Sequence, residues 1–355
     1  MVGHLHAFRA ITIIMIVAVH VSAITLYFNY DLTNAGTAIS VLWAFNESLL
    51  HNSTIFFALI SGILFARILE ARGWKRFFRS KAINVVAPYA IVTILYALFA
   101  LDVINGGYIK VFSGTFSEFP KLVFADFFHL KVQSNPIFWY IPVLLILFAA
   151  TPLIVSLLRS AAAPIAIAAI LLAPLVVSRT WPGFSWQNVI FFLAPYAAGI
   201  YFGTPSRYEQ TLEFFRRWKW PAIAVVIASS GSVWFVTRDL EPVMWGPVNP
   251  FESVTYIQKM VAAPLLLLWL HRFDEGMPRA LSRLADDSFA IYFLHIWLVV
   301  GMLWLIDRLI GANDSPLLFQ SLAIAGTAAI LAILLVVIGI LRRILGKWSR
   351  PLIGA

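Results

Sequence analysis

The chain has 355 residues, of which 61% are hydrophobic and 12% charged, and its mean hydropathy is +0.86. This composition excludes a soluble globular protein and predicts a polytopic membrane protein. The absence of cysteine excludes disulfides and thiolate chemistry, and the formal charge of +9 does not indicate a nucleic-acid partner, because the cations gather where membrane topology would place them.

Segments of about 20 apolar residues predict an all-α bundle of about ten transmembrane helices. They lie near 7–28, 48–69, 83–104, 136–158, 162–178, 187–203, 220–237, 253–270, 287–308 and 316–341. Most of the 26 lysines and arginines fall on the side of the two termini, which predicts an N-in, C-in topology. The longest outer connections are near 105–135 and 238–252, and we expect residues 1–355 to form one transmembrane domain with no appended soluble domain.

The first apolar segment carries two ionisable residues, Arg9 and His20. They are separated by about three helical turns, so both side chains leave one face of the helix, roughly 16 Å apart along its axis. Ionisable groups inside a membrane need a partner or a watery cavity. Histidine suits proton transfer from a hydroxyl, although a buried histidine can also simply bond two helices together, and an arginine at a helix end is ordinary.

A basic segment, Arg72–Lys81, follows the second predicted span. On a helix, Arg76 and Arg79 would present two guanidinium groups on one face, beside Lys75 and Trp74, which suits a phosphate-rich ligand with a stacked base. A solvated cytoplasmic loop or an anionic lipid headgroup would explain the same residues.

Other polar residues interrupt the second and ninth spans. His51 is placed near the outer end of the second span, and Ser61 and His295, the latter close to Tyr292, fall within a turn or two of the depth of His20. This predicts a polar cluster at one depth, although an interfacial histidine and packing hydrogen bonds are simpler interpretations. Motifs of nucleotide hydrolases, glycosyltransferases and zinc peptidases are absent from the sequence.

Five motifs in this order resemble those of a known family. They are the Arg9 and His20 pair with ten residues between, Phe56–Gly62 with a Phe pair before Ser-Gly, Arg76-Phe77-Phe78-Arg79 followed by Ala87-Pro88-Tyr89, Phe138–Pro142 with Thr151-Pro152-Leu153, and Ser288–His295. Together they resemble the membrane acyltransferase-3 family of polysaccharide O-acyltransferases, over residues from about 3 to 340.

The resemblance implies transfer of an acyl group, usually acetyl from cytoplasmic acetyl-CoA, to a hydroxyl of an extracytoplasmic glycan or its lipid-linked precursor, at a bacterial inner membrane. In that scheme Arg76 and Arg79, with Trp74 and Lys75, hold the nucleotide, and Arg9 orients the thioester. His20 is expected to act in catalysis with His295 and Tyr292. Acceptor binding is expected of Trp139, His51 and Ser61. The expected partners are the bilayer, acyl-CoA and a glycan, with no metal and no nucleic acid. Assembly into a homo-oligomer and binding to polysaccharide-assembly proteins remain open alternatives.

Two other functions remain alternatives. A transporter or flippase for a glycan precursor would use the polar stripe as a path and would show discontinuous helices and repeated halves; no repeat is visible in the sequence. A membrane O-acyltransferase acting on lipids or proteins also places a histidine within an apolar span, but the Arg9 and His20 pair in the first span argues against it.

Overall fold

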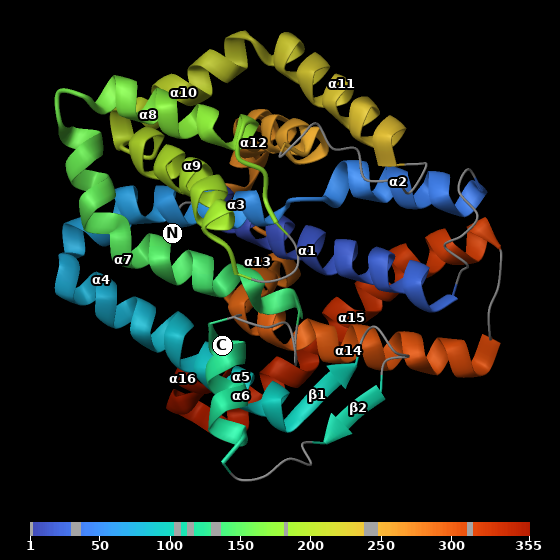
Figure 1. The fold of residues 1–355 in the computed structure, drawn as a ribbon. Helices are drawn as coiled ribbons and strands as arrows, with labels where there is room; N and C mark the ends of the chain where they lie inside the picture. Colours follow the sequence, from blue (N-terminus) through green and yellow to red (C-terminus); the bar gives the residue numbers. More distant parts are fainter. Residues whose placement is uncertain are drawn as a thin grey trace.

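The computed structural model describes residues 3–29, 37–102, 108–111, 117–128, 136–180, 184–237, 248–310 and 315–355. Nearly all of these residues are helical (Figure 1), which confirms the predicted all-α membrane bundle. Within the described chain, the one sheet is an antiparallel hairpin of β1 (Phe99–Asp102) and β2 (Tyr108–Val111).

The helices have the following bounds. The first half contains α1 (Gly3–Asn29), α2 (Ala38–Leu50), α3 (Thr54–Leu64), α4 (Trp74–Lys81), α5 (Ala87–Leu98), α6 (Phe119–Phe127), α7 (Tyr140–Arg159) and α8 (Ala163–Leu172). The second half contains α9 (Trp186–Phe202), α10 (Pro205–Arg217), α11 (Lys219–Thr237), α12 (Pro250–Leu270), α13 (Arg279–Asp286), α14 (Ser288–Ile310), α15 (Pro316–Leu345) and α16 (Ser349–Ile353). Short π and 3-10 turns join several of them: η1 (Phe65–Leu69), η2 (Glu70–Arg72), η3 (Ala82–Val86), η4 (Pro136–Trp139), η5 (Ala173–Leu175), η6 (His271–Phe273) and η7 (Gly346–Trp348).

Eight helical segments of the described chain are long and apolar enough to cross a membrane, and nine if α9 and α10, which meet at a bend of 107°, form one span. Each of the ten predicted segments contains a helix. The helical part of the segment near 83–104 ends at Leu98, before β1, and the segment near 162–178 is the shorter apolar helix Ala163–Leu175. The chain is therefore a multi-pass integral membrane protein.

The second and third spans differ from their predicted bounds. The second runs from Ala38 to Ile68 and breaks between α2 and α3, where Asn52 adopts a φ of 57°. Asparagine tolerates this left-handed conformation better than most residues. His51 and Asn52 therefore lie inside the span rather than near its outer end. The third runs from Trp74 to Leu98, so the predicted basic loop is helical.

The two long predicted connections are described only in part, through residues 108–111 and 117–128 of the first and 248–252 of the second. The remaining residues of 105–135 and 238–252 lie outside the described chain.

Helix α1 lies in the middle of the bundle (Figure 1) and contacts α2, α3, α12, α13, α14 and α15. Beside it, α3 and α9 approach backbone to backbone at Gly62 and Gly199. A Cβ on Gly62 would lie 2.2 Å from the Tyr196 carbonyl oxygen, and a Cβ on Gly199 would lie 2.2 Å from that of Leu59. Small residues permit this close packing of membrane helices, and it fixes α3 alongside α1.

Candidate active site

Two polar contacts join α1 to α14. Arg9 Nη2 donates to the buried Ser288 Oγ at 2.7 Å, and His20 Nδ1 lies 2.9 Å from His295 Nε2. Ser288 and His295 are seven residues apart, about two turns, so they share a face of α14 as Arg9 and His20 share a face of α1. The prediction that both α1 residues leave one face agrees with this geometry, and the two helices run parallel.

The partners of His295 determine which nitrogen of His20 is free. His295 Nδ1 lies 2.8 Å from the carbonyl oxygen of Tyr292 and 3.1 Å from that of Ile291. Carbonyl oxygens only accept, so Nδ1 carries the proton of neutral His295 and Nε2 is an acceptor. His20 Nδ1 must then donate to it, which leaves the lone pair on His20 Nε2. No hydrogen-bond partner of that atom is found in the described part of the chain.

His20 lines a cavity of about 550 Å³, which we call the histidine cavity. Its wall also includes His51, Trp139, Glu252 and Tyr292. Trp139 and Tyr292 are buried, and the Tyr292 hydroxyl donates to the Ile137 carbonyl oxygen at 2.9 Å. This bond occupies the donor of Tyr292, so its hydroxyl anchors η4 against α14.

A buried ionic network forms one side of the histidine cavity. Arg179 donates to both carboxylate oxygens of Glu252, at 3.1 and 3.2 Å, and Asn52 Nδ2 donates to the same carboxylate at 2.6 Å. His51 lies between two carboxylates, with Nδ1 2.8 Å from Glu47 Oε2 and Nε2 3.3 Å from Glu252 Oε1. Bidentate pairing and several hydrogen bonds are what a charge requires in an apolar interior.

Glu47, Arg179 and Glu252 were not singled out as site residues from the sequence. Their position at the ends of apolar segments was the one signal available. The side chains meet only because α2, α12 and the non-helical segment after η5, which carries Arg179, converge at the break between α2 and α3.

Two buried polar atoms on residues of this cavity have no hydrogen-bond partner in the described chain. They are Trp43 Nε1, a donor, and Asn52 Oδ1, an acceptor. In addition, the Arg179 guanidinium lies 5.1 Å from the centre of the Trp139 ring. Two residues that line the cavity with His20 therefore carry unpaired polar atoms, and Trp139 adds an aromatic ring to the wall.

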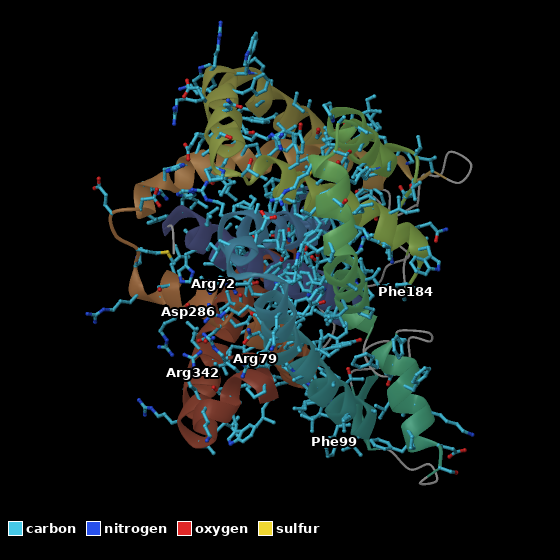
Figure 2. The ribbon with its side chains drawn as sticks, turned by 90° about the vertical axis from the view of Figure 1, so that its left-hand side faces the viewer. Arg72, Arg79, Phe99, Phe184, Asp286 and Arg342 are labelled. Atoms are coloured by element: carbon cyan, nitrogen blue, oxygen red, sulfur yellow. The ribbon has the colours of Figure 1, made fainter. Side chains whose placement is uncertain are left out.

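The second cavity, of about 910 Å³, is bordered by Arg9 and Ser61, and we call it the basic cavity. Its cations are Arg9, Arg72, Lys81, Arg342, Lys347 and Arg350, against one acidic side chain among its described lining residues, that of Asp286. Figure 2 shows Arg72, Asp286 and Arg342 near one another. Such an excess of cations favours an anionic ligand.

Irregular backbone surrounds the basic cavity. Ile68 belongs to the π-helical turn η1, and Asn84 and Val85 belong to the π-helical turn η3; all three line the cavity. Such turns occur frequently at functional sites. Next to the cavity, burial raises the pKa of the Asp287 carboxyl, although its ion pair with Arg342 opposes the shift.

The structure brings some predicted site residues together and not others. Arg9 lies in the basic cavity, while His20, Tyr292, Trp139 and His51 line the histidine cavity, and His295 contacts His20. Ser61 lines the basic cavity and not the histidine cavity.

The four residues predicted to hold the nucleotide lie on α4 and are exposed. They are Trp74, Lys75, Arg76 and Arg79, and none of them is a lining residue of the basic cavity. Trp74 stacks on Phe65 instead, with ring centroids 5.5 Å apart. Arg79 is labelled in the same region of Figure 2 as Arg72 and Arg342. Helix α4 contributes Ser80 and Lys81, at its C-terminal end, to the wall of the cavity.

One cluster in the described chain has the residue types of a metal site: His4, His271 and Asp274. Asp274 accepts from both imidazoles, with Nδ1 to carboxylate distances of 2.9 Å, and His4 Nε2 lies 2.8 Å from the Tyr208 hydroxyl. These hydrogen bonds tie the start of α1 to η6. The cluster lines neither of the two cavities.

A family model described as an acyltransferase domain matches residues 3–342, which is nearly the whole described bundle. No curated protein and no solved structure matches the chain. A match of this extent shows that the chain belongs to the acyltransferase 3 family and is a membrane acyltransferase.

Proposed function

We propose that this protein is an O-acyltransferase that moves an acyl group, acetyl in the first instance, from cytoplasmic acyl-CoA to a hydroxyl of an extracytoplasmic carbohydrate. The acceptor class is a surface polysaccharide, a lipopolysaccharide O-unit or a lipid-linked precursor. The observation that carries the proposal is the hydrogen-bonded chain from the backbone carbonyls of α14 through His295 to His20, which leaves a basic nitrogen beside a polar cavity.

In this mechanism His20 Nε2 takes the proton of the acceptor hydroxyl as the oxygen attacks the thioester carbonyl carbon. The carbon–sulfur bond then breaks, and the CoA thiolate leaves with the proton returned by His20. The imidazolium that exists between these steps is stabilised by its bond to His295 Nε2. A transient acyl group on His20 itself, followed by transfer to the hydroxyl, is the covalent form of the same reaction.

We assign the acyl-CoA donor to the basic cavity, because the cations that line this cavity can bind the phosphates of CoA. Arg9, held by Ser288, lies at its inner wall on the same face of α1 as His20. A thioester arm extending from Arg9 toward His20 has to cover roughly 16 Å, eleven residues of helical rise. Arg76 and Arg79, which are exposed beside this cavity, stay predicted contacts for the outer part of the nucleotide.

The acceptor is assigned to the histidine cavity. A sugar presents both hydroxyl groups and an apolar ring face, which match the unpaired Trp43 Nε1 and Asn52 Oδ1 and the ring of Trp139. With the N-in, C-in topology, this cavity faces the outer side and the basic cavity faces the cytoplasm. The donor and acceptor then approach His20 from opposite sides of the membrane.

The test is transfer of labelled acetyl from acetyl-CoA to isolated surface polysaccharide by the purified full-length protein in proteoliposomes. Wild type should form labelled ester, and His20→Ala should reduce the rate about 10²- to 10⁴-fold, the usual contribution of a general base. His6→Ala is the matched control, since this histidine of α1 lines neither cavity. Equal rates for wild type and a folded His20→Ala protein would refute the mechanism.

One observation favours a transporter as the second candidate: the second span is discontinuous at Asn52, beside the polar cavity. Transport predicts movement of a glycan precursor across the proteoliposome membrane without release of CoA from acetyl-CoA. Measurement of both activities on the same preparation separates the two functions.

A further inference from the structure

Part of the wall of the basic cavity lies beyond the region that the family model matches. That model ends at residue 342, whereas the segment 346–355, which we call the C-terminal segment, contributes Lys347, Ser349, Arg350 and Gly354 to the lining. This segment therefore borders the same space as Arg9 in the first span.

The C-terminal segment is fixed in position. Helix α15 ends at Gly346, which has a φ of 52°, and the chain then turns through η7 into α16, which contacts α5 and α14. Buried Ser349 donates to the Ala355 carbonyl oxygen at 2.8 Å. Gly354 has a φ of 79°, and a Cβ added to it would lie only 3.3 Å from Phe289 Cβ. Its conformation and its close packing both favour glycine.

The cations of this segment face the cavity without acidic partners. Arg342, just before it, pairs with Asp287. In the described chain no carboxylate lies within ion-pair distance of Lys347 or Arg350, and the nearest ring contact of Lys347 is with the neighbouring Trp348 at 5.9 Å. Unpaired cations around a cavity that already holds Arg9 repel one another unless an anion enters.

We propose that the C-terminal segment supplies phosphate-binding cations to the donor site, with Lys347 and Arg350 contacting the phosphates of the CoA moiety. This inference rests on the proposed function, which places acyl-CoA in the basic cavity. The cations on α1, η2 and α4 would then face one side of the ligand and the C-terminal segment the other, so the anion would be enclosed between the first span and the last. A phospholipid headgroup has the same phosphate chemistry, and the experiment separates the two sources.

The test is calorimetric titration of CoA into the purified full-length protein and into a Lys347→Ala/Arg350→Ala variant. Two lost charge-assisted contacts should weaken CoA binding about tenfold or more. Binding of pantetheine, which has no nucleotide phosphates, should be unchanged. The matched control is Arg343→Ala, because Arg343 is an exposed arginine near the end of α15 that does not line the cavity.

Each outcome decides a different point. If the variant binds CoA as tightly as wild type, the C-terminal segment is not part of the donor site, although the proposed function stands. If wild type itself binds no CoA, the proposed function fails and the inference fails with it. If the variant keeps its CoA affinity but loses thermal stabilisation by phosphatidylglycerol, Lys347 and Arg350 hold a lipid headgroup and the inference is overturned.

Discussion

Replacing His295 tests whether this residue positions His20 or only packs against it. His295→Leu removes the acceptor that bonds to His20 Nδ1 at 2.9 Å, in a place where His295 is fully buried. His20 is then free to rotate or to change tautomer, and its Nδ1–H is left without a partner. His295→Gln fills a similar volume and offers a side-chain oxygen that can accept the same bond.

The expected loss follows from that one bond. A buried hydrogen-bond donor left unpaired costs about 1–3 kcal/mol, and a bond to a charged group contributes about 1.5–3 kcal/mol. If this cost falls on the transition state, His295→Leu reduces kcat about 10- to 100-fold, because each 1.4 kcal/mol is a factor of ten. His295→Gln should recover most of the loss, while the KM for acetyl-CoA stays near its wild-type value in both variants.

The assay is the initial rate of ester formation in proteoliposomes at saturating acetyl-CoA, with the amount of folded protein normalised by size-exclusion chromatography. A packing role for His295 predicts that the leucine variant, which stays apolar, is the more active of the two. That order of activities, Leu above Gln, would refute the reasoning.

Three further predictions concern other parts of the bundle. Gly62→Ala should lower the free energy of unfolding by about 1–3 kcal/mol or more, because the new Cβ would overlap a backbone oxygen of α9. Gly231→Ala is the control and should leave it unchanged, because a Cβ there meets open space. Thermal unfolding in detergent measures both variants. Arg179→Ala should destabilise the protein by about 3–5 kcal/mol, because it leaves the buried Glu252 carboxylate without its main counter-ion. Adding Glu252→Gln to this variant should restore part of the lost stability. A denaturation series in which the double variant shows no recovery would contradict this. Trp139→Leu should raise the KM for the glycan about three- to tenfold and leave the KM for acetyl-CoA unchanged, and equal changes in both constants would place Trp139 outside the acceptor site.

Much of the bundle could be predicted because its signals are local. Each of the ten apolar segments found by hydropathy contains a helix, and helical periodicity placed Arg9 and His20 on one face, where both contact α14. The late motif likewise identified His295, which lies about two turns from Ser288 on the face of α14 that contacts α1.

What could not be predicted depends on contacts between distant segments. The network of Glu47, Arg179 and Glu252 forms only when segments far apart in the sequence meet, and nothing local to any one of these residues indicates the other two. The start of the second span was not predicted, because this span consists of two short helices with a break at Asn52 between them. The cations of the C-terminal segment were interpreted as a cytoplasmic rim, since nothing local indicated a cavity beside Arg9.

The most direct test of the account measures donor binding and turnover in the same protein. Acetyl-CoA is titrated calorimetrically into wild type and His20→Ala, and release of free CoA in the presence of polysaccharide is then followed for both. The account predicts that the two proteins bind acetyl-CoA with the same affinity and that only wild type turns it over at its full rate, because the cations of the basic cavity bind the donor and His20 acts on the hydroxyl. Loss of acetyl-CoA binding in His20→Ala, or full turnover without His20, would contradict the separation of donor site and catalytic base.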